Sequence, residues 1–119
     1  MKYTALVLVG LFMCSAFSFG QTLQKGDFTA SVNSEGWSLA AGTGDRTFIE
    51  FISFDKSFDA PPTVLVTLSG CDAAADEQGT VRVHLAVDKI TKVGCVVKIK
   101  TWGNSRINAV YGSYLAFAK

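Results

Sequence analysis

The stretch from Lys98 to Asn104 ends in an aromatic residue beside a turn. It reads KIKTWGN, so polar and apolar residues alternate up to Trp102, and Gly103 and Asn104 follow. Alternation of this kind is typical of a strand, and a Gly-Asn pair is typical of a turn. A tryptophan at a strand end can present a flat apolar face and one N–H donor. Such a face suits a sugar ring, which is apolar on one side and polar at its edge; a Trp102 that closes a hydrophobic core is the alternative.

The sequence contains no arrangement of residues typical of an enzyme. His84 is the single histidine, and it lies beside Arg82 in a predicted strand, as a surface histidine does. There is no Gly-x-Ser-x-Gly motif, and the stretch 42–44 lacks the third glycine and the helix of a dinucleotide-binding loop. Asp72 and Asp76 are interpreted as part of a solvated turn, or at most as a weak cation site. We therefore predict a protein that is not an enzyme and needs no cofactor.

The first 20 residues have the pattern of a secretory signal peptide. Lys2 supplies the positive charge, residues 6–13 form a short apolar run, and Ser18 and Gly20 are the small residues at positions −3 and −1. We predict cleavage after Gly20, so that residues 21–119 form the mature, secreted domain. An N-terminal membrane anchor is the alternative, but the apolar run is short for a membrane span. No later segment is apolar over a spanning length.

Composition restricts the partners of the chain. Without Lys2, ten Lys and Arg residues balance ten Asp and Glu residues. This balance argues against nucleic acid or an acidic membrane surface, both of which require a basic patch. Once Cys14 is removed, Cys71 and Cys95 remain, and an even count in a secreted chain predicts one disulfide. Two buried thiols or a bridge between subunits are the alternatives, and no metal site is predicted.

Alternation with a period of two dominates the chain after residue 20. Together with the intervening turn signals it predicts an all-β protein, an antiparallel sandwich or barrel of six short strands. The predicted strands cover 27–32, 48–54, 63–69, 81–88, 95–102 and 109–117. Several of these strands carry bulky residues on both faces. Their aromatic side chains offer more surface than a sandwich of this size readily buries; one unusually large core that buries them all is the alternative. We expect an oligomer to cover this surface. The residues concerned are Phe48, Phe51, Phe58, Tyr111, Tyr114 and Phe117.

The order of several short motifs resembles the H-type lectin family, which includes the snail agglutinins and the C-terminal domain of discoidins. The motifs are Gly36-Trp37, Gly42-Thr43-Gly44-Asp45, Ile52-Ser53-Phe54, Phe58-x-x-Pro61-Pro62-x-Val64, Asp72, Val81-Arg82-Val83, Thr91-x-x-Gly94 and Thr101-Trp102-x-Asn104. The resemblance extends over about residues 25 to 117. It implies a six-stranded antiparallel β-sandwich that forms a trimer or a dimer of trimers. It also implies binding of galactose or N-acetylgalactosamine, without a metal, in clefts between protomers.

The resemblance assigns roles to individual residues. Asp45 matches the loop aspartate that accepts hydrogen bonds from sugar hydroxyls, and Gly42 or Gly44 matches the glycine whose backbone contacts the sugar. Arg82 matches the arginine of the fourth strand. Trp102 matches the tryptophan that ends the fifth strand.

The chain departs from the family pattern at several positions. Gly103 stands where the snail proteins have a histidine that contacts the sugar, and Asn108 stands where they have a tyrosine. We keep both, with Asn104, in the predicted carbohydrate site, and expect them to widen the cleft or shift selection toward plain galactose. The cysteine positions of the snail lectins also differ, so Cys71 and Cys95 would form a different bridge.

Two functions remain open from the sequence, beside a weaker third, a small extracellular hydrolase, which the single, poorly placed histidine disfavours. The first is a secreted, multivalent lectin that recognises terminal galactose or N-acetylgalactosamine on cell surfaces. The second is a secreted structural or adhesive oligomer of the same fold that does not bind sugar.

Overall fold

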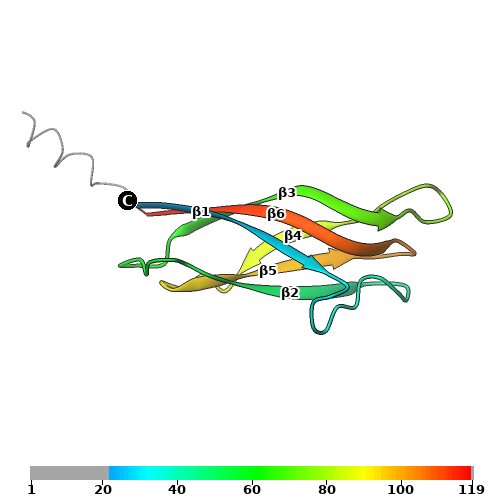
Figure 1. Ribbon diagram of the computed structural model, residues 1–119, viewed down its shortest axis with the longest axis horizontal. Coiled ribbons are helices and arrows are strands. Elements are labelled where there is room, and N and C mark those ends of the chain that lie inside the picture. The colour runs from blue at the N-terminus through cyan, green and yellow to red at the C-terminus, as the bar shows by residue number, and fades with distance from the viewer. Residues whose placement is uncertain (1–21, 119) are drawn as a thin grey trace, which may run out of the picture.

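The computed structural model describes residues 22–118, which form two three-stranded antiparallel sheets packed face to face (Figure 1). The first sheet has the strand order β1-β6-β3 and the second the order β2-β5-β4. The predicted all-β sandwich of six strands is confirmed, and the predicted signal peptide, 1–20, lies outside the described residues. The strands are β1 (Thr22–Ser31), β2 (Arg46–Ser53), β3 (Thr63–Ala74), β4 (His84–Asp88), β5 (Gly94–Thr101) and β6 (Arg106–Ala118).

Several strand boundaries differ from the prediction. Strand β1 begins at Thr22 instead of residue 27, and β6 begins at Arg106 instead of residue 109. The pairing of β3 with β6 shifts register between Leu68 and Gly70 and again between Asp72 and Ala73, and the strand continues to Ala74. Asp72 therefore lies in a strand rather than in a solvated turn. The fourth strand begins at His84 instead of residue 81, because the backbone N–H of Arg82 donates to the Ser105 hydroxyl and not to a neighbouring strand.

The central strand of each sheet carries the core. Strand β5 lies between β2 and β4, and strand β6 lies between β1 and β3, so both have partners on each side. Val97 and Ile99 on β5 and Val110 on β6 are fully buried. β-Branched side chains of this kind pack well on a pleated surface, which explains why these segments form strands.

The six aromatic residues that seemed too many for one core divide into two groups. Phe48, Phe58 and Tyr114 are buried. Phe51, Tyr111 and Phe117 are exposed, and Phe51 has 77% of its surface accessible. The prediction of surplus aromatic surface is therefore correct for three of the six residues.

The disulfide predicted between Cys71 and Cys95 is wrong as a bridge within the chain, because both are free thiols there. They belong to opposite sheets: Cys71 pairs with Val110 on β6, and Cys95 pairs with Ile52 on β2. Cys71 lies near the end of β3 and Cys95 near the start of β5, which places them toward opposite ends of the sandwich (Figure 1). Cys95 is buried in the core, and burial raises the pKa of its thiol.

The two ends of the sandwich differ in the segments that lie there. The β1–β2 loop, the β3–β4 loop and the β5–β6 turn gather at one end, which we call the loop end (Figure 1). At the other end Thr22 pairs with Ala118, so both ends of the described chain leave the sandwich there. The candidate site residues of the sequence analysis are concentrated at the loop end.

We expect Gly112→Ala to destabilise the fold, because a methyl group at this position of β6 would overlap the ring of Phe28 in the core. Overpacking of this kind lowers the free energy of unfolding by about 1–3 kcal/mol. Gly70→Ala is the matched control, because a methyl group there would lie 3.8 Å from the Tyr111 ring, an ordinary contact. Urea unfolding of both variants tests this prediction, and equal midpoints would contradict it.

Candidate functional site

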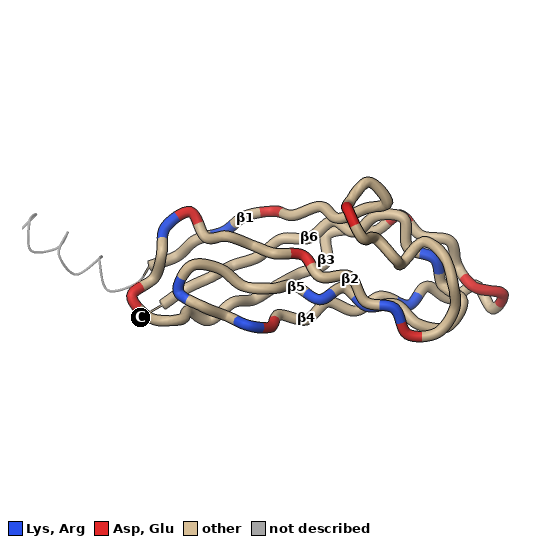
Figure 2. The backbone as a smooth tube through the Cα atoms, turned by 90° about the horizontal axis from the view of Figure 1, so that it is seen from below, with Lys and Arg blue, Asp and Glu red and all other residues tan. Residues whose placement is uncertain are grey.

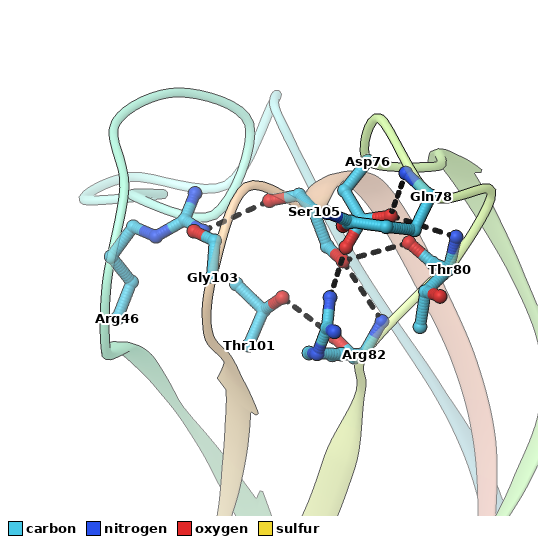
Figure 3. A network of polar contacts seen from close by, with 8 residues as sticks. All are labelled: Arg46, Asp76, Gln78, Thr80, Arg82, Thr101, Gly103 and Ser105. Carbon is cyan, nitrogen blue, oxygen red and sulfur yellow. Dashed lines mark hydrogen bonds and ion pairs between the residues drawn. The ribbon is translucent and has the colours of Figure 1, made fainter.

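Arg46 ties the β1–β2 loop to the β5–β6 turn. Its Nε donates to the Gly44 carbonyl at 3.0 Å and one of its terminal nitrogens donates to the Ala41 carbonyl at 2.8 Å. The other terminal nitrogen donates to the carbonyls of Gly103 and Ser105, at 3.0 and 2.9 Å (Figure 3). The planar, five-donor guanidinium suits such divergent acceptors, and no other side chain could satisfy all four carbonyls.

The same loop is fixed to the sandwich by apolar anchors. The Trp37 indole N–H donates to the Ile107 carbonyl at 2.9 Å, and its ring lies 4.9 Å from that of Phe48. The fully buried Leu39 accepts a hydrogen bond from the Ile107 N–H through its carbonyl. Gly36-Trp37, which carried part of the family resemblance, is therefore a structural anchor of the loop that holds Asp45.

A direct backbone hydrogen bond joins the loop and the turn. The N–H of Gly44 donates to the carbonyl of Gly103 at 3.0 Å. Both glycines have positive φ angles, 79° and 68°, a conformation in which glycine avoids the steric cost of a side chain. Because Asp45 follows Gly44 and Trp102 precedes Gly103, this bond brings the predicted aspartate and tryptophan to the same place.

Asp45, His84, Lys100 and Trp102 line a shallow hollow of about 360 Å³ at the loop end, on the outer face of the β2-β5-β4 sheet. Trp102 is 37% exposed, so it is neither core nor fully open to solvent. Asp45 is open, with 74% of its side chain accessible, and lies 3.4 Å from the Lys100 ammonium group. His84 and Lys100 are direct cross-strand neighbours on β4 and β5. The hollow thus offers an acceptor, two nitrogen-bearing side chains and an apolar ring.

Arg82 lies beside this hollow and contacts the turn. A Cβ atom at Gly103 would lie 3.4 Å from one of its terminal nitrogens. That nitrogen also donates to the carboxylate of Asp76 (Figure 3). The prediction of a solvated Asp76 is wrong, because its side chain is only 2% exposed. The Thr80 backbone N–H and the Arg82 guanidinium hold the pKa of Asp76 below its ordinary range.

The backbone around Arg82 is fixed by two buried hydroxyls. The Ser105 hydroxyl accepts from the Arg82 N–H at 3.0 Å and donates to the Thr80 carbonyl at 3.1 Å. The Thr101 hydroxyl donates to the Arg82 carbonyl at 2.6 Å. Both residues have no accessible surface, so these bonds are made away from water and hold the segment before β4 against the β5–β6 turn.

A second hollow, of about 440 Å³, is lined by Gly42, Thr43, Asp76, Asn104 and Arg106, among others. The predicted site residues are therefore divided: Asp45 and Trp102 line the first hollow, and Gly42 and Asn104 line the second. Gly44 is exposed and lines neither hollow. Asn108 lines neither hollow, and its carbonyl accepts from the N–H of Val32.

Sequence reasoning missed Arg46, Asp76, His84 and Lys100 as residues of this region. Arg46 acts on residues 57 and 59 positions away in the chain, through carbonyls that have no sequence signature. For Lys100 and His84 there was a usable signal, because alternation on neighbouring strands places both on the face that leads to Trp102.

Charges of both signs are interspersed along the described chain (Figure 2). The Lys98 ammonium group pairs with Asp88 at 2.9 Å, and its hydrogen bond lowers the pKa of that carboxyl. Within residues 22–118 no group of three or more His, Cys, Asp or Glu side chains is placed to hold a metal ion. No helix in that part of the chain is long and apolar enough to span a membrane.

Comparison with known proteins identifies the family. The model of the H-type lectin domain matches residues 49–117. The chain belongs to the H-type lectin family. It is therefore a carbohydrate-binding lectin domain. The matched range contains Arg82 and Trp102 of this lectin but begins after Asp45 and Arg46.

Individual relatives agree with this assignment. The lectin is 31% identical over 83 residues to a Fuscovulum blasticum protein named "ATP synthase subunits region ORF 7", covering 70% of each chain. It is 36% identical over 74 residues to discoidin-2 of Dictyostelium discoideum, covering 62% of this chain and 27% of that protein. The solved structures of recombinant and wild-type Dictyostelium discoidin II superpose with TM-scores of 0.74 and 0.75 at 27% identity. They are matched over 83% and 84% of the lectin but over only 37% of their own chains.

We expect Arg46→Lys to loosen the loop end of the lectin. Lysine keeps the charge but cannot donate to four carbonyls at once, so the free energy of unfolding should fall by about 2 kcal/mol. Hydrogen exchange of the Gly44 amide, which bonds to Gly103, should accelerate. Arg106→Lys is the control, since Arg106 is exposed and its guanidinium makes no hydrogen bond within the described residues. Unchanged exchange at Gly44 in Arg46→Lys would contradict the assigned role.

Proposed function

We propose that this lectin is a secreted, multivalent protein that recognises terminal galactose or N-acetylgalactosamine on cell-surface glycans, in clefts between protomers. The observation that carries the proposal is the convergence of Asp45, Trp102 and Arg82 around the hydrogen bond between Gly44 and Gly103. These three residues come from separate parts of the chain and supply the three kinds of contact that a galactose-type ring needs.

The chemistry of each contact follows from the side chain. In a galactose-type ring O4 is axial, so O3 and O4 converge on one side and one carboxylate can accept hydrogen bonds from both. Asp45 is suited to this because its carboxylate is open and only loosely paired with Lys100. The half-exposed Trp102 offers apolar area to the ring or to an acetamide methyl group.

Arg82 is the better of the two nearby arginines for binding a ligand. The guanidinium of Arg46 donates through all three of its nitrogens to loop carbonyls. Within residues 22–118 the Arg82 guanidinium has one partner, Asp76, and its side chain is 30% exposed. Its remaining N–H groups are therefore available to sugar hydroxyls.

The two departures from the family pattern lie at different distances from this hollow. Gly103 is part of the turn, and a side chain there would meet both a positive φ and the Arg82 guanidinium. Arg82 therefore lies against the position where the snail lectins have their histidine. Asn108 stands away from the hollow on its own protomer, so any contact it makes with sugar would be with one bound to a neighbouring copy.

Multivalency completes the proposal. One small sugar site buries few heavy atoms, so its dissociation constant should be on the order of 0.1–1 mM. Several sites on one assembly would strengthen attachment to clustered glycans by about 10² or more. Exposed apolar residues on the outer faces of both sheets support self-association, with Ile49 and Phe51 on one face and Leu23, Leu65 and Phe117 on the other.

The second candidate function is a structural or adhesive oligomer without sugar binding. The same exposed apolar faces favour it, since they serve assembly whether or not a sugar is bound. Binding of glycans by the folded protein separates the two candidates.

We expect Asp45→Ala to abolish sugar binding while leaving the fold intact. The side chain is exposed and its one ion pair is loose, so its loss should change the free energy of unfolding by less than about 0.5 kcal/mol. A glycan array with and without chelator, followed by titration with galactose and N-acetylgalactosamine, tests this. Asp59→Ala, an exposed aspartate outside the loop end, is the control. Binding that survives Asp45→Ala would reject the site, and a wild-type protein that binds no glycan would favour the structural function.

We expect Phe51→Asp to prevent assembly and agglutination. The change places a charge on an outer sheet face where a large apolar side chain is now open to solvent. Binding of a single sugar should weaken only as far as the neighbouring protomer contributes to the cleft. Sedimentation and agglutination assays measure the effect, with Val93→Asp, a 64% exposed turn residue, as the control. Agglutination by a demonstrated monomer would contradict the proposal.

A further inference from the structure

The pair formed by Asp76 and Arg82 has an asymmetric environment. The side chain of Asp76 is 2% exposed and that of Arg82 is 30% exposed. A carboxylate this deeply buried must have its oxygens satisfied, because an unpaired buried charge is strongly unfavourable. The partner arginine, by contrast, reaches from the buried carboxylate toward the surface beside Gly103.

Each oxygen of the Asp76 carboxylate has a separate task. One oxygen accepts from the backbone N–H groups of Gln78 and Thr80, at 3.0 and 2.9 Å. The other accepts from Arg82 (Figure 3). The backbone of Asp76 closes the same loop, since its N–H donates to the Thr80 carbonyl and its own carbonyl accepts from Gly79. The position of the carboxylate is thus set by its own loop, independently of Arg82.

The chain of hydrogen bonds continues to the β5–β6 turn. The Thr80 carbonyl accepts from the Ser105 hydroxyl, which in turn accepts from the Arg82 backbone N–H. Arg82 is therefore held at its backbone by the turn and at its guanidinium by Asp76. A long side chain restrained at both ends loses little further freedom when it binds a ligand.

We propose that Asp76 is a positioning residue that fixes the Arg82 guanidinium beside Gly103, so that its remaining N–H groups are pre-organised for a galactose-type ring held by Asp45 and Trp102. This inference rests on the proposed function. Because the Arg82 side of the pair is 30% exposed, the pair contributes little net stability, and it is better accounted for by the placement of Arg82 than by stabilisation of the fold. The lowered pKa of Asp76 agrees with a carboxylate that stays ionised throughout the neutral range.

The test uses Asp76→Asn in the full mature protein. Asparagine keeps an oxygen for the Gln78 and Thr80 N–H groups but removes the negative charge that holds Arg82. We expect affinity for galactose and N-acetylgalactosamine to fall about tenfold, with the fold retained. Asp88→Asn is the matched control: Asp88 also pairs with a basic residue and accepts from a backbone N–H, but it lies at the end of β4 far from the loop end. Its affinity should stay within about twofold of wild type.

A spectroscopic measurement separates positioning from general loosening. The Arg82 guanidinium ¹H–¹⁵N signals should be distinct and slowly exchanging in wild type and should collapse toward free-arginine values in Asp76→Asn. Wild-type affinity in folded Asp76→Asn, a rise in affinity, or lost affinity with unchanged Arg82 signals would each overturn the proposal. An equal loss in Asp88→Asn would do the same.

Two outcomes need a further variant or measurement: an Asp76→Asn protein that does not fold, and a wild-type protein that binds neither sugar. If Asp76→Asn does not fold, Asp76→Glu keeps the charge and displaces it by one methylene; it should shift the Arg82 signals and weaken binding, and unchanged affinity would overturn the inference. If wild type binds neither sugar, the proposed function fails, and the Arg82 signals still decide whether Asp76 fixes the guanidinium.

Discussion

The loop end of this lectin depends on one guanidinium. Arg46 is the first residue of β2, and its nitrogens converge on carbonyls from two connections that have no backbone ladder of their own. Carbonyls at strand ends need a donor, and a buried or half-buried carbonyl without one is costly. By satisfying four of them, Arg46 makes the loop that carries Asp45 and the turn that carries Trp102 into one rigid unit.

A second arginine in the same region behaves differently. Arg82 makes a single contact with a buried carboxylate and stays partly open. All three guanidinium nitrogens of Arg46 donate to loop carbonyls, whereas within residues 22–118 the guanidinium of Arg82 donates only to Asp76. Strand β5 positions both arginines, since its Thr101 pairs with Arg46 and donates to the Arg82 carbonyl. The fully buried Val97 and Ile99 fix this strand in the core.

The sequence allowed the architecture to be predicted because alternation is a local property. Val64 and Val97 lie in segments whose pattern and β-branched content predict strands without reference to the rest of the chain. Trp102 was proposed from its position at a strand end, but Asp45 and Arg82 were proposed only through resemblance to a family. The shared location of the three residues depends on a hydrogen bond between Gly44 and Gly103, 59 residues apart. Nothing local signals such a bond.

The errors have the same origin. An even number of cysteines in a secreted chain is a sound reason to expect a bridge, but it carries no information about which sheet, or which end of it, each cysteine occupies. Asp76 was interpreted, together with Asp72, as part of a solvated turn. Its burial arises from the way the β3–β4 loop folds back on the β5–β6 turn, which is a tertiary feature.

The pairing of Thr22 with Ala118 gives the domain a built-in polarity. Both ends of the described chain leave from the pole opposite the loop end (Figure 1). A tag, a linker or another protein joined directly to Thr22 or Ala118 would therefore start on the side away from Asp45 and Trp102. On a sensor surface or a particle, tethering through Thr22 or Ala118 would leave the loop end of every copy facing outward, so the fold itself would set the orientation of the domain.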